Sequence, residues 1–216
     1  MRIKPYLPYI GIAAFALLVA ILAAYLSLEN QIPVPRSGPT TTIVLLRPGK
    51  LLPTFSLQGD DGKPFTRASL TGHWSLLYFG YTHCPDVCPV TLADLAQMAT
   101  RLQDLPAADR PHVYFISVDP KRDTLPALQQ YVRNFDADFA AATGEVPELE
   151  IISKALGVDF SYQPADQAPG YSVNHSVAVL VIDPEARETA VYTPPLIPAR
   201  MADDYRFILK LHGAQP

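Results

Sequence analysis

The spacing of apolar and polar residues separates an apolar N-terminal run from a longer region in which strand and helix patterns alternate. Residues 9–28 form a run of twenty residues without a charge. A helix of that length spans about 30 Å and would cross a bilayer. Residues 29–49 are rich in Pro, Thr and Gly and are typical of an extended linker, with an edge strand over 41–46. The predicted organisation is therefore a short N-terminus at 1–8, an anchor at 9–28, a linker at 29–49, a globular domain at 50–212 and a tail at 213–216.

Within the globular part, the hydrophobic periods change several times between two and 3.6 residues. Alternation on both sides of Gly59–Gly62 predicts a β-hairpin over 53–66. Near-continuous apolar runs predict strands buried on both faces, and a weaker strand follows them; these segments are 73–81, 112–119, 176–183 and 189–193. Helical spacing predicts helices over 89–105, 123–135, 147–158 and 199–212. In the first helix Val90 begins the apolar stripe, and Asp123 is the predicted N-cap of the second.

The order of these elements is hairpin, strand–helix–strand, and then a strand pair followed by a helix. This order predicts an α/β fold in which helices cover both faces of a mixed sheet. It is the order of a thioredoxin-like fold with an N-terminal β-hairpin extension, preceded here by one transmembrane helix.

Charge refines the expected location of the domain. Arg2 and Lys4 precede the apolar run and Glu29 follows it, so the positive-inside rule keeps the N-terminus cytoplasmic. The run exceeds the roughly 7 to 15 apolar residues of a cleaved signal peptide, which favours a retained anchor. With no Arg- and Ser-rich presequence before it, we expect a bacterial inner membrane and a periplasmic domain. All 21 acidic and 15 of the 17 basic residues follow residue 28, and a net charge of −6 there disfavours nucleic acid as a partner.

The chain contains two cysteines, Cys84 and Cys88, within YFGYTHCPDVCP. A disulfide between them would close a very small loop and constrain the unfolded chain little, so a purely structural role is a poor explanation. They lie between a predicted strand and a helix with Pro89 in its first turn, at the sheet edge where α/β folds place ligands. The helix dipole there favours thiolates, and a spacing of four brings the sulfurs about one turn apart. A redox couple and a pair of soft metal ligands both fit this pattern.

The inventory of further ligands narrows the choice of metal. Iron–sulfur clusters and closed zinc sites need about four strong ligands, whereas Cu(I) accepts two or three soft ones. Of the five histidines, His175 precedes the third buried strand, and in a thioredoxin-like fold that loop lies against the active-site helix. His175 is therefore the candidate third ligand.

Five charged neighbours of the cysteines have two interpretations each. Asp86, between the cysteines, would tune the charge of the metal site or contact a partner, or it would be a solvated turn residue. Asp119, at the end of the second buried strand, would approach the site or serve as a turn-former before Pro120. Lys121 and Arg122, with Asp123, would form a docking surface, although a solvated helix start is the preferred interpretation.

Three segments, FGYTHCPDVCP, SVDPKRDT and YSVNHS, together resemble the signature stretches of the Sco/SenC family. The resemblance covers roughly residues 50–212. It implies a thioredoxin-like fold and copper bound by Cys84, Cys88 and His175. It also implies a role in assembling the copper centre of cytochrome c oxidase. The copper-bearing oxidase subunit would then be a partner, along with a copper donor and a thiol reductant.

A rival function uses the same cysteines differently. In a thiol–disulfide oxidoreductase, Cys84 would be the attacking thiol and Cys88 the resolving thiol, and both would be catalytic. Such enzymes normally carry C-x-x-C, and the wider spacing here favours a metal. A redox or copper sensor acting through a partner is a third alternative.

Overall fold

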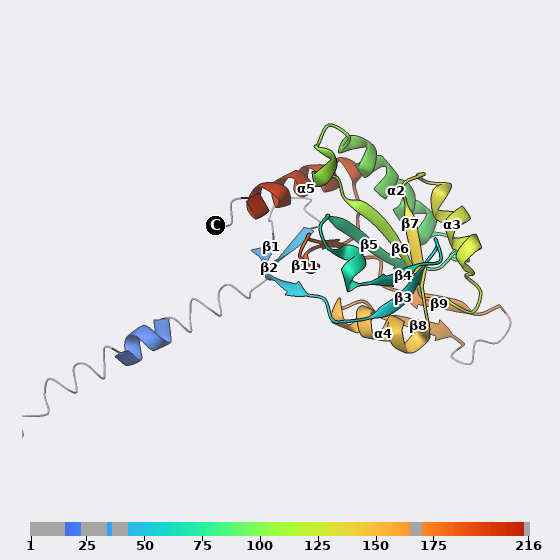
Figure 1. The fold of residues 1–216 in the computed structure, drawn as a ribbon, viewed down its shortest axis with the longest axis horizontal. Coiled ribbons are helices and arrows are strands. Elements are labelled where there is room, and N and C mark those ends of the chain that lie inside the picture. The colour runs from blue at the N-terminus through green and yellow to red at the C-terminus, as the bar shows by residue number, and fades with distance from the viewer. Residues whose placement is uncertain (1–15, 23–33, 36–42, 165–169, 214–216) are drawn as a thin grey trace, which may run out of the picture.

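The computed structural model describes residues 16–22, 34–35, 43–164 and 170–213 (Figure 1). The predicted anchor at 9–28 lies mostly outside these residues, and only 16–22 are seen, as a helical segment with exposed apolar side chains. No helix in the described ranges combines the length and apolar character needed to cross a membrane.

In the described part of the chain, nine strands form one mixed sheet. In order across the sheet they are β1 (Val34–Pro35), β2 (Ile43–Leu51), β11 (Arg187–Tyr192), β10 (Val179–Ile182), β5 (Ser75–Gly80), β6 (His112–Ser117), β7 (Ala140–Thr143), β3 (Ser56–Gly59) and β4 (Pro64–Thr66). Strands β5, β6 and β7 are parallel, and the other neighbours are antiparallel. Strands β8 (Phe160–Gln163) and β9 (Ser172–His175) pair with each other in a separate two-stranded sheet.

Helices cover both faces of the main sheet, as the sequence predicts. The α-helices after the N-terminal segment are α2 (Val87–Arg101), α3 (Leu125–Arg133), α4 (Val146–Ala155) and α5 (Pro198–Gly213), and the short 3-10 helices are η1 (Arg67–Leu70) and η2 (Ala107–Asp109). The crossovers through α2 and α3 advance in the same direction across the sheet, so right-handedness puts both helices over one face. Helix α5 packs on α2, and α4 lies over the opposite face (Figure 1).

The hairpin and the buried strands follow the prediction closely. Strands β3 and β4 form the expected hairpin, and all six residues of β5 are buried. Two details differ. Val90 is 57% exposed, because the buried face of α2 is formed instead by Cys88, Leu92, Leu95 and Met98.

The predicted linker at 29–49 also ends earlier than expected. Residues from Ile43 onward form β2, which pairs with β11 on one side and with β1 on the other. This segment is therefore the second strand of the sheet, and β1 takes the edge position that was predicted for it.

The topology brings three segments to one edge of the sheet. The parallel strands β5 and β6 both end there, so the loops after Gly80 and Ser117 are neighbours. Strand β10 runs antiparallel to β5 with Val179 opposite Tyr78, so the chain entering β10 starts from the same edge. The loop with the cysteines, the loop with Asp119 and the segment with His175 therefore converge.

Candidate metal centre

The two cysteines occupy the junction between β5 and α2. Cys84 lies in the loop, where its backbone N–H donates to the Tyr81 carbonyl at 3.2 Å. Cys88 is in the first turn of α2, and its N–H donates to the Cys84 sulfur at 3.4 Å. Both are free thiols; Cys84 is 8% exposed and Cys88 is fully buried. The helix start thus holds both sulfurs on the same side.

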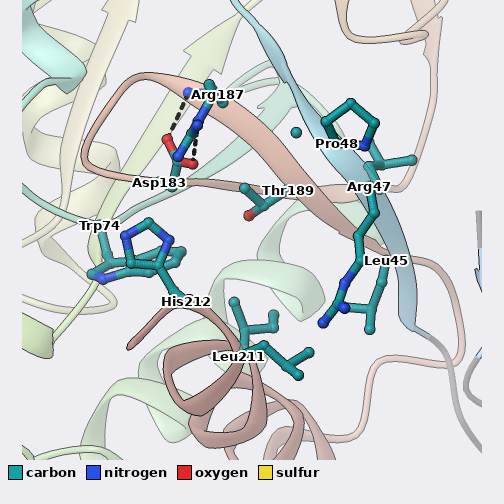
Figure 2. A pocket seen from close by; sticks show the side chains of 12 residues that line it. Leu45, Arg47, Pro48, Trp74, Asp183, Arg187, Thr189, Leu211 and His212 are labelled. Atoms are coloured by element: carbon teal, nitrogen blue, oxygen red, sulfur yellow. Dashed lines mark hydrogen bonds and ion pairs between the residues drawn. The ribbon is translucent and has the colours of Figure 1, made fainter. Parts of the chain in front are cut away.

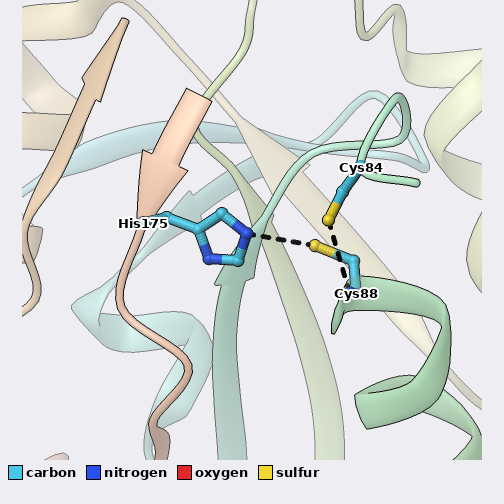
Figure 3. Close-up of side chains that lie close together, drawn as sticks. All are labelled: Cys84, Cys88 and His175. Carbon is cyan, nitrogen blue, oxygen red and sulfur yellow. Dashed lines mark hydrogen bonds between the residues drawn. The ribbon is translucent and has the colours of Figure 1, made fainter. Parts of the chain in front are cut away.

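His175 reaches these sulfurs from the end of β9. Its Nε2 atom lies 3.3 Å from the Cys88 sulfur, and its Nδ1 atom lies 3.1 Å from the Ser176 carbonyl. A carbonyl only accepts, so Nδ1 carries the proton and the Nε2 lone pair faces the sulfurs. The ligand atoms of Cys84, Cys88 and His175 all lie within 4.8 Å of one another (Figure 3). This is the arrangement expected of three ligands around one ion.

Burial controls the protonation of this group. It raises the pKa of the Cys88 thiol to about 12 and lowers the pKa of His175, so both groups are neutral near pH 7. The expectation that the helix dipole would lower the thiol pKa is wrong for Cys88, because desolvation outweighs the dipole. The Tyr78 hydroxyl donates to the same sulfur at 3.6 Å. A bound cation would favour the thiolate form of Cys88 over the neutral thiol, since coordination deprotonates a thiol outright.

Asp86 and His83 flank the cysteines without joining the three ligands. Asp86 is exposed at the N-cap position of α2, and its side chain makes no capping bond. His83 has a 55% exposed side chain, and its Nδ1 atom lies 3.5 Å from a carboxylate oxygen of Asp123.

Asp123 supports the loop beside the candidate site, a position that the sequence pattern did not predict. It is 1% exposed, and its carboxylate accepts hydrogen bonds from the Thr82 N–H at 2.9 Å, the Thr82 hydroxyl at 2.5 Å and the Ser117 hydroxyl at 2.6 Å. The N-cap of α3 is Thr124, which accepts from the Ala127 N–H. The predicted solvated helix start is thus wrong for Asp123, which braces the loop carrying Cys84.

Asp119 is fully buried at the same edge, and its carboxylate does not join the cysteines. It accepts from the Arg122 guanidinium at 2.5 Å and from the Tyr171 hydroxyl. Arg122 is accordingly only 22% exposed and is not a solvated residue either. The density of charged residues in SVDPKRDT, directly after a buried strand, was the available signal that some of them are buried in pairs.

A cavity of about 290 Å³ lies elsewhere, at the opposite end of the sheet (Figure 2). Trp74 and His212 line one part of it, and Arg187 forms an ion pair with the buried Asp183 at 2.8 Å in another. Trp74 directly precedes β5, whereas the cysteines follow that strand. The cavity is therefore separate from the candidate metal centre.

Comparison with known proteins identifies the family. A family model described as SCO1/SenC matches residues 46–210. The chain belongs to the SCO1/SenC family. Among curated SCO relatives, the mitochondrial SCO2 homolog of Bos taurus is 35% identical over 152 residues, which cover 70% of this chain and 57% of that protein.

Solved structures of SCO proteins share the fold. Arabidopsis thaliana ScoI with copper bound has a TM-score of 0.67 at 31% identity and covers 74% of this chain and 99% of that chain. Bradyrhizobium japonicum ScoI with copper bound has a TM-score of 0.64 at 29% identity, with 72% and 98% covered. The chain spans about half the length of the first curated relatives it matches.

Proposed function

We propose that this chain binds copper through Cys84, Cys88 and His175 and delivers it during assembly of cytochrome c oxidase. The observation that carries the proposal is the convergence of two sulfurs and an unprotonated imidazole nitrogen within 4.8 Å. The names of the Arabidopsis and Bradyrhizobium relatives, both solved with copper bound, support copper as the ion.

The donor set fits copper on chemical grounds. Two thiolates and a neutral imidazole satisfy Cu(I), which accepts three ligands, while a structural zinc site would require a fourth. Both thiols must be reduced and must lose their protons on loading. His175 is half-buried and, with Asn174, lines a cavity of about 280 Å³, which offers a route of approach to this residue. An incoming ligand can therefore replace the imidazole first.

Delivery then proceeds by substitution of one ligand after another. The proposed acceptor is the copper-bearing subunit of cytochrome c oxidase, whose thiols or imidazoles would displace His175 and then the two sulfurs. A copper donor and a thiol reductant complete the cycle, because an oxidised cysteine pair cannot load the ion. Membership of the SCO1/SenC family supports this role.

We further propose that the chain is anchored in a bacterial inner membrane with its domain in the periplasm. The uncharged run at 9–28, and exposed apolar side chains such as Leu17 and Leu18 within the helical part, support an anchor. Arg2 and Lys4 set the orientation. Fractionation after alkaline extraction, with a C-terminal reporter that is active only outside the cytoplasm, tests both points; release of the chain by alkali would refute the anchor.

Thiol–disulfide exchange is the second candidate function. The free thiols of Cys84 and Cys88 are close enough for the Cys88 N–H to donate to the Cys84 sulfur. Oxidation would form the S–S bond, releasing two protons and passing two electrons to a disulfide substrate. The high pKa of Cys88 makes it a slow partner in such exchange near neutral pH, whereas a bound metal ion would displace the thiol proton on coordination.

Copper titration of the full-length chain in mild detergent tests the primary proposal. Cys84→Ser, Cys88→Ser and His175→Ala are each expected to weaken copper binding by about tenfold or more. His83→Ala is the matched control, because His83 adjoins Cys84 in sequence but lies outside the three-ligand group. If His175→Ala bound copper as tightly as the parent while both reduced disulfides equally well, thiol exchange would replace the copper function.

A further inference from the structure

The position of His175 is not fixed by strand pairing with the main sheet. His175 ends β9, and in the described residues β9 pairs with β8 alone. The cysteines, in contrast, follow β5, which is hydrogen-bonded to strands on both sides. The chain reaches β10 of the main sheet only at Val179, four residues after His175. Topology therefore brings His175 to the correct edge, and side-chain contacts to the β8–β9 hairpin set its final position beside the sulfurs.

Arg122, in the loop between β6 and α3, makes several contacts to this hairpin. Its Nε atom donates to the buried Asp119 carboxylate at 2.5 Å, and its Nη1 atom donates to the Tyr171 carbonyl at 2.9 Å. The guanidinium carbon lies 3.6 Å from the centre of the Tyr171 ring, so the planar group stacks on that ring. Tyr171 in turn donates its hydroxyl to Asp119. Asp119, Arg122 and Tyr171 form a closed triangle, here called the clasp.

The clasp joins the two halves of the metal site. Tyr171 directly precedes β9, four residues before His175. On its other side, the Arg122 guanidinium lies 5.6 Å from the centre of the Tyr81 ring, and Tyr81 accepts the hydrogen bond from the Cys84 N–H. The Tyr81 and His175 rings also meet in a T-shaped arrangement, with centres 5.8 Å apart and planes at 86°. The Arg122 guanidinium thus interacts with Tyr171, which leads into β9, and with Tyr81, whose carbonyl supports the cysteine loop.

We propose that Arg122 is a positioning residue that holds His175 against Cys84 and Cys88 for copper binding. This inference rests on the proposed copper function and adds a determinant that lies outside the three ligands. Without the clasp, the hairpin keeps fewer side-chain contacts, among them the Tyr162 hydroxyl on the Val118 carbonyl at 2.8 Å and the ring contacts of Tyr78 and Tyr81 with His175. His175 would then sample positions away from the sulfurs, and the ion would be held by two ligands.

The test is a double-mutant cycle on copper affinity in the full-length chain. Arg122→Ala is expected to weaken copper binding about tenfold or more when His175 is present, within the range typical of residues that orient metal ligands. In a His175→Ala background the same change is expected to alter affinity by less than about twofold, since the ligand it positions is gone. Arg122→Lys keeps the charge but loses the planar stack on Tyr171. It should therefore weaken copper binding nearly as much as Arg122→Ala, with a smaller risk of misfolding.

Arg187→Ala is the matched control. Arg187 is 35% exposed and pairs with a buried aspartate, Asp183, at the opposite end of the sheet (Figure 2). It should reduce stability and leave copper affinity unchanged. If Arg122→Ala and Arg122→Lys weakened copper equally with and without His175, the clasp would act through general stability and the inference would be wrong.

Hydrogen exchange on the copper-free chain separates this inference from the copper function itself. Amides of β8 and β9 should exchange faster in Arg122→Ala and Arg122→Lys, but not in Arg187→Ala, while amides of β5 and β6 keep their protection. Unchanged exchange in the hairpin would overturn the clasp even if copper binds as proposed. A different result is faster exchange in the hairpin together with copper binding that does not depend on His175. That result would keep the clasp as a structural feature, but it would overturn the proposed copper site and the role of Arg122 in it.

Discussion

Replacement of Gly80 by alanine should damage the metal centre directly. Gly80 ends β5, and a Cβ atom there would lie 2.7 Å from the Cys88 sulfur and 2.7 Å from a ring carbon of Phe115. Ordinary contact begins at 3.4 Å, so relief requires a displacement of about 0.7 Å. Phe115 and Cys88 are both fully buried, which leaves no open direction for either. Overpacking of this kind costs about 1–3 kcal/mol of folding free energy.

The sulfur is the smaller obstacle, so we expect Cys88 to move away from its present distance of 3.3 Å from the His175 Nε2 atom. Copper affinity should fall about tenfold or more, measured by competition with a chelator of known affinity. Gly144→Ala is the matched control, because its Cβ atom would lie 2.7 Å from a Leu57 methyl carbon, away from the ligands. Both variants should show lower stability in urea. Equal copper affinities for the two variants would refute the reasoning.

Three other predictions concern the buried polar groups. At pH 7.5, iodoacetamide should label Cys84 before Cys88, because Cys88 is fully buried with a pKa of about 12; mass spectrometry showing the reverse order would contradict the burial argument. Asp123→Asn should destabilise the chain by about 2–3 kcal/mol and weaken copper binding, because the amide cannot accept all three hydrogen bonds; unchanged urea midpoints would contradict this. Burial raises the pKa of Glu188 from 4.5 to about 7, so its protonated form favours folding below pH 4.5 and that contribution is lost as pH rises to 7. Glu188→Gln should therefore stabilise the chain at pH 8 and change little at pH 4.5; an equal effect in urea at both pH values would contradict the assignment.

The placement of the three candidate ligands could be predicted because it depends on strong local patterns. Long apolar runs mark β5, β6 and β10, and the parallel or antiparallel pairing of these strands decides which loops share an edge. The cysteines and His175 stand directly beside two of these runs. Their convergence follows from topology, without knowledge of any individual contact.

The supporting residues could not be predicted in the same way, because their burial depends on partners distant in sequence. Asp123 is enclosed by Thr82, which lies 41 residues earlier, and Arg122 contacts Tyr171, which lies 49 residues later. Without these partners, the stretch PKRDT is typical of a solvated helix start. The same limit applies to the Cys88 pKa, where the helix dipole is visible in the sequence and the competing desolvation is not.

Short elements without an apolar period were also missed. Strand β7 consists of the residues AAAT, whose small side chains carry little β propensity, and it is held between β6 and β3. Strands β8 and β9 have only each other as sheet partners among the described residues, and aromatic contacts such as Tyr162 with Tyr171 support them. Their formation follows from tertiary packing.

The most direct test of the central claim is X-ray absorption of the copper-loaded, full-length chain, compared with His175→Ala. The account predicts two sulfur neighbours and one nitrogen neighbour per copper in the parent, and loss of the nitrogen alone in the variant. A copper environment that is the same in both proteins, or one with no sulfur, would contradict a centre formed by Cys84, Cys88 and His175.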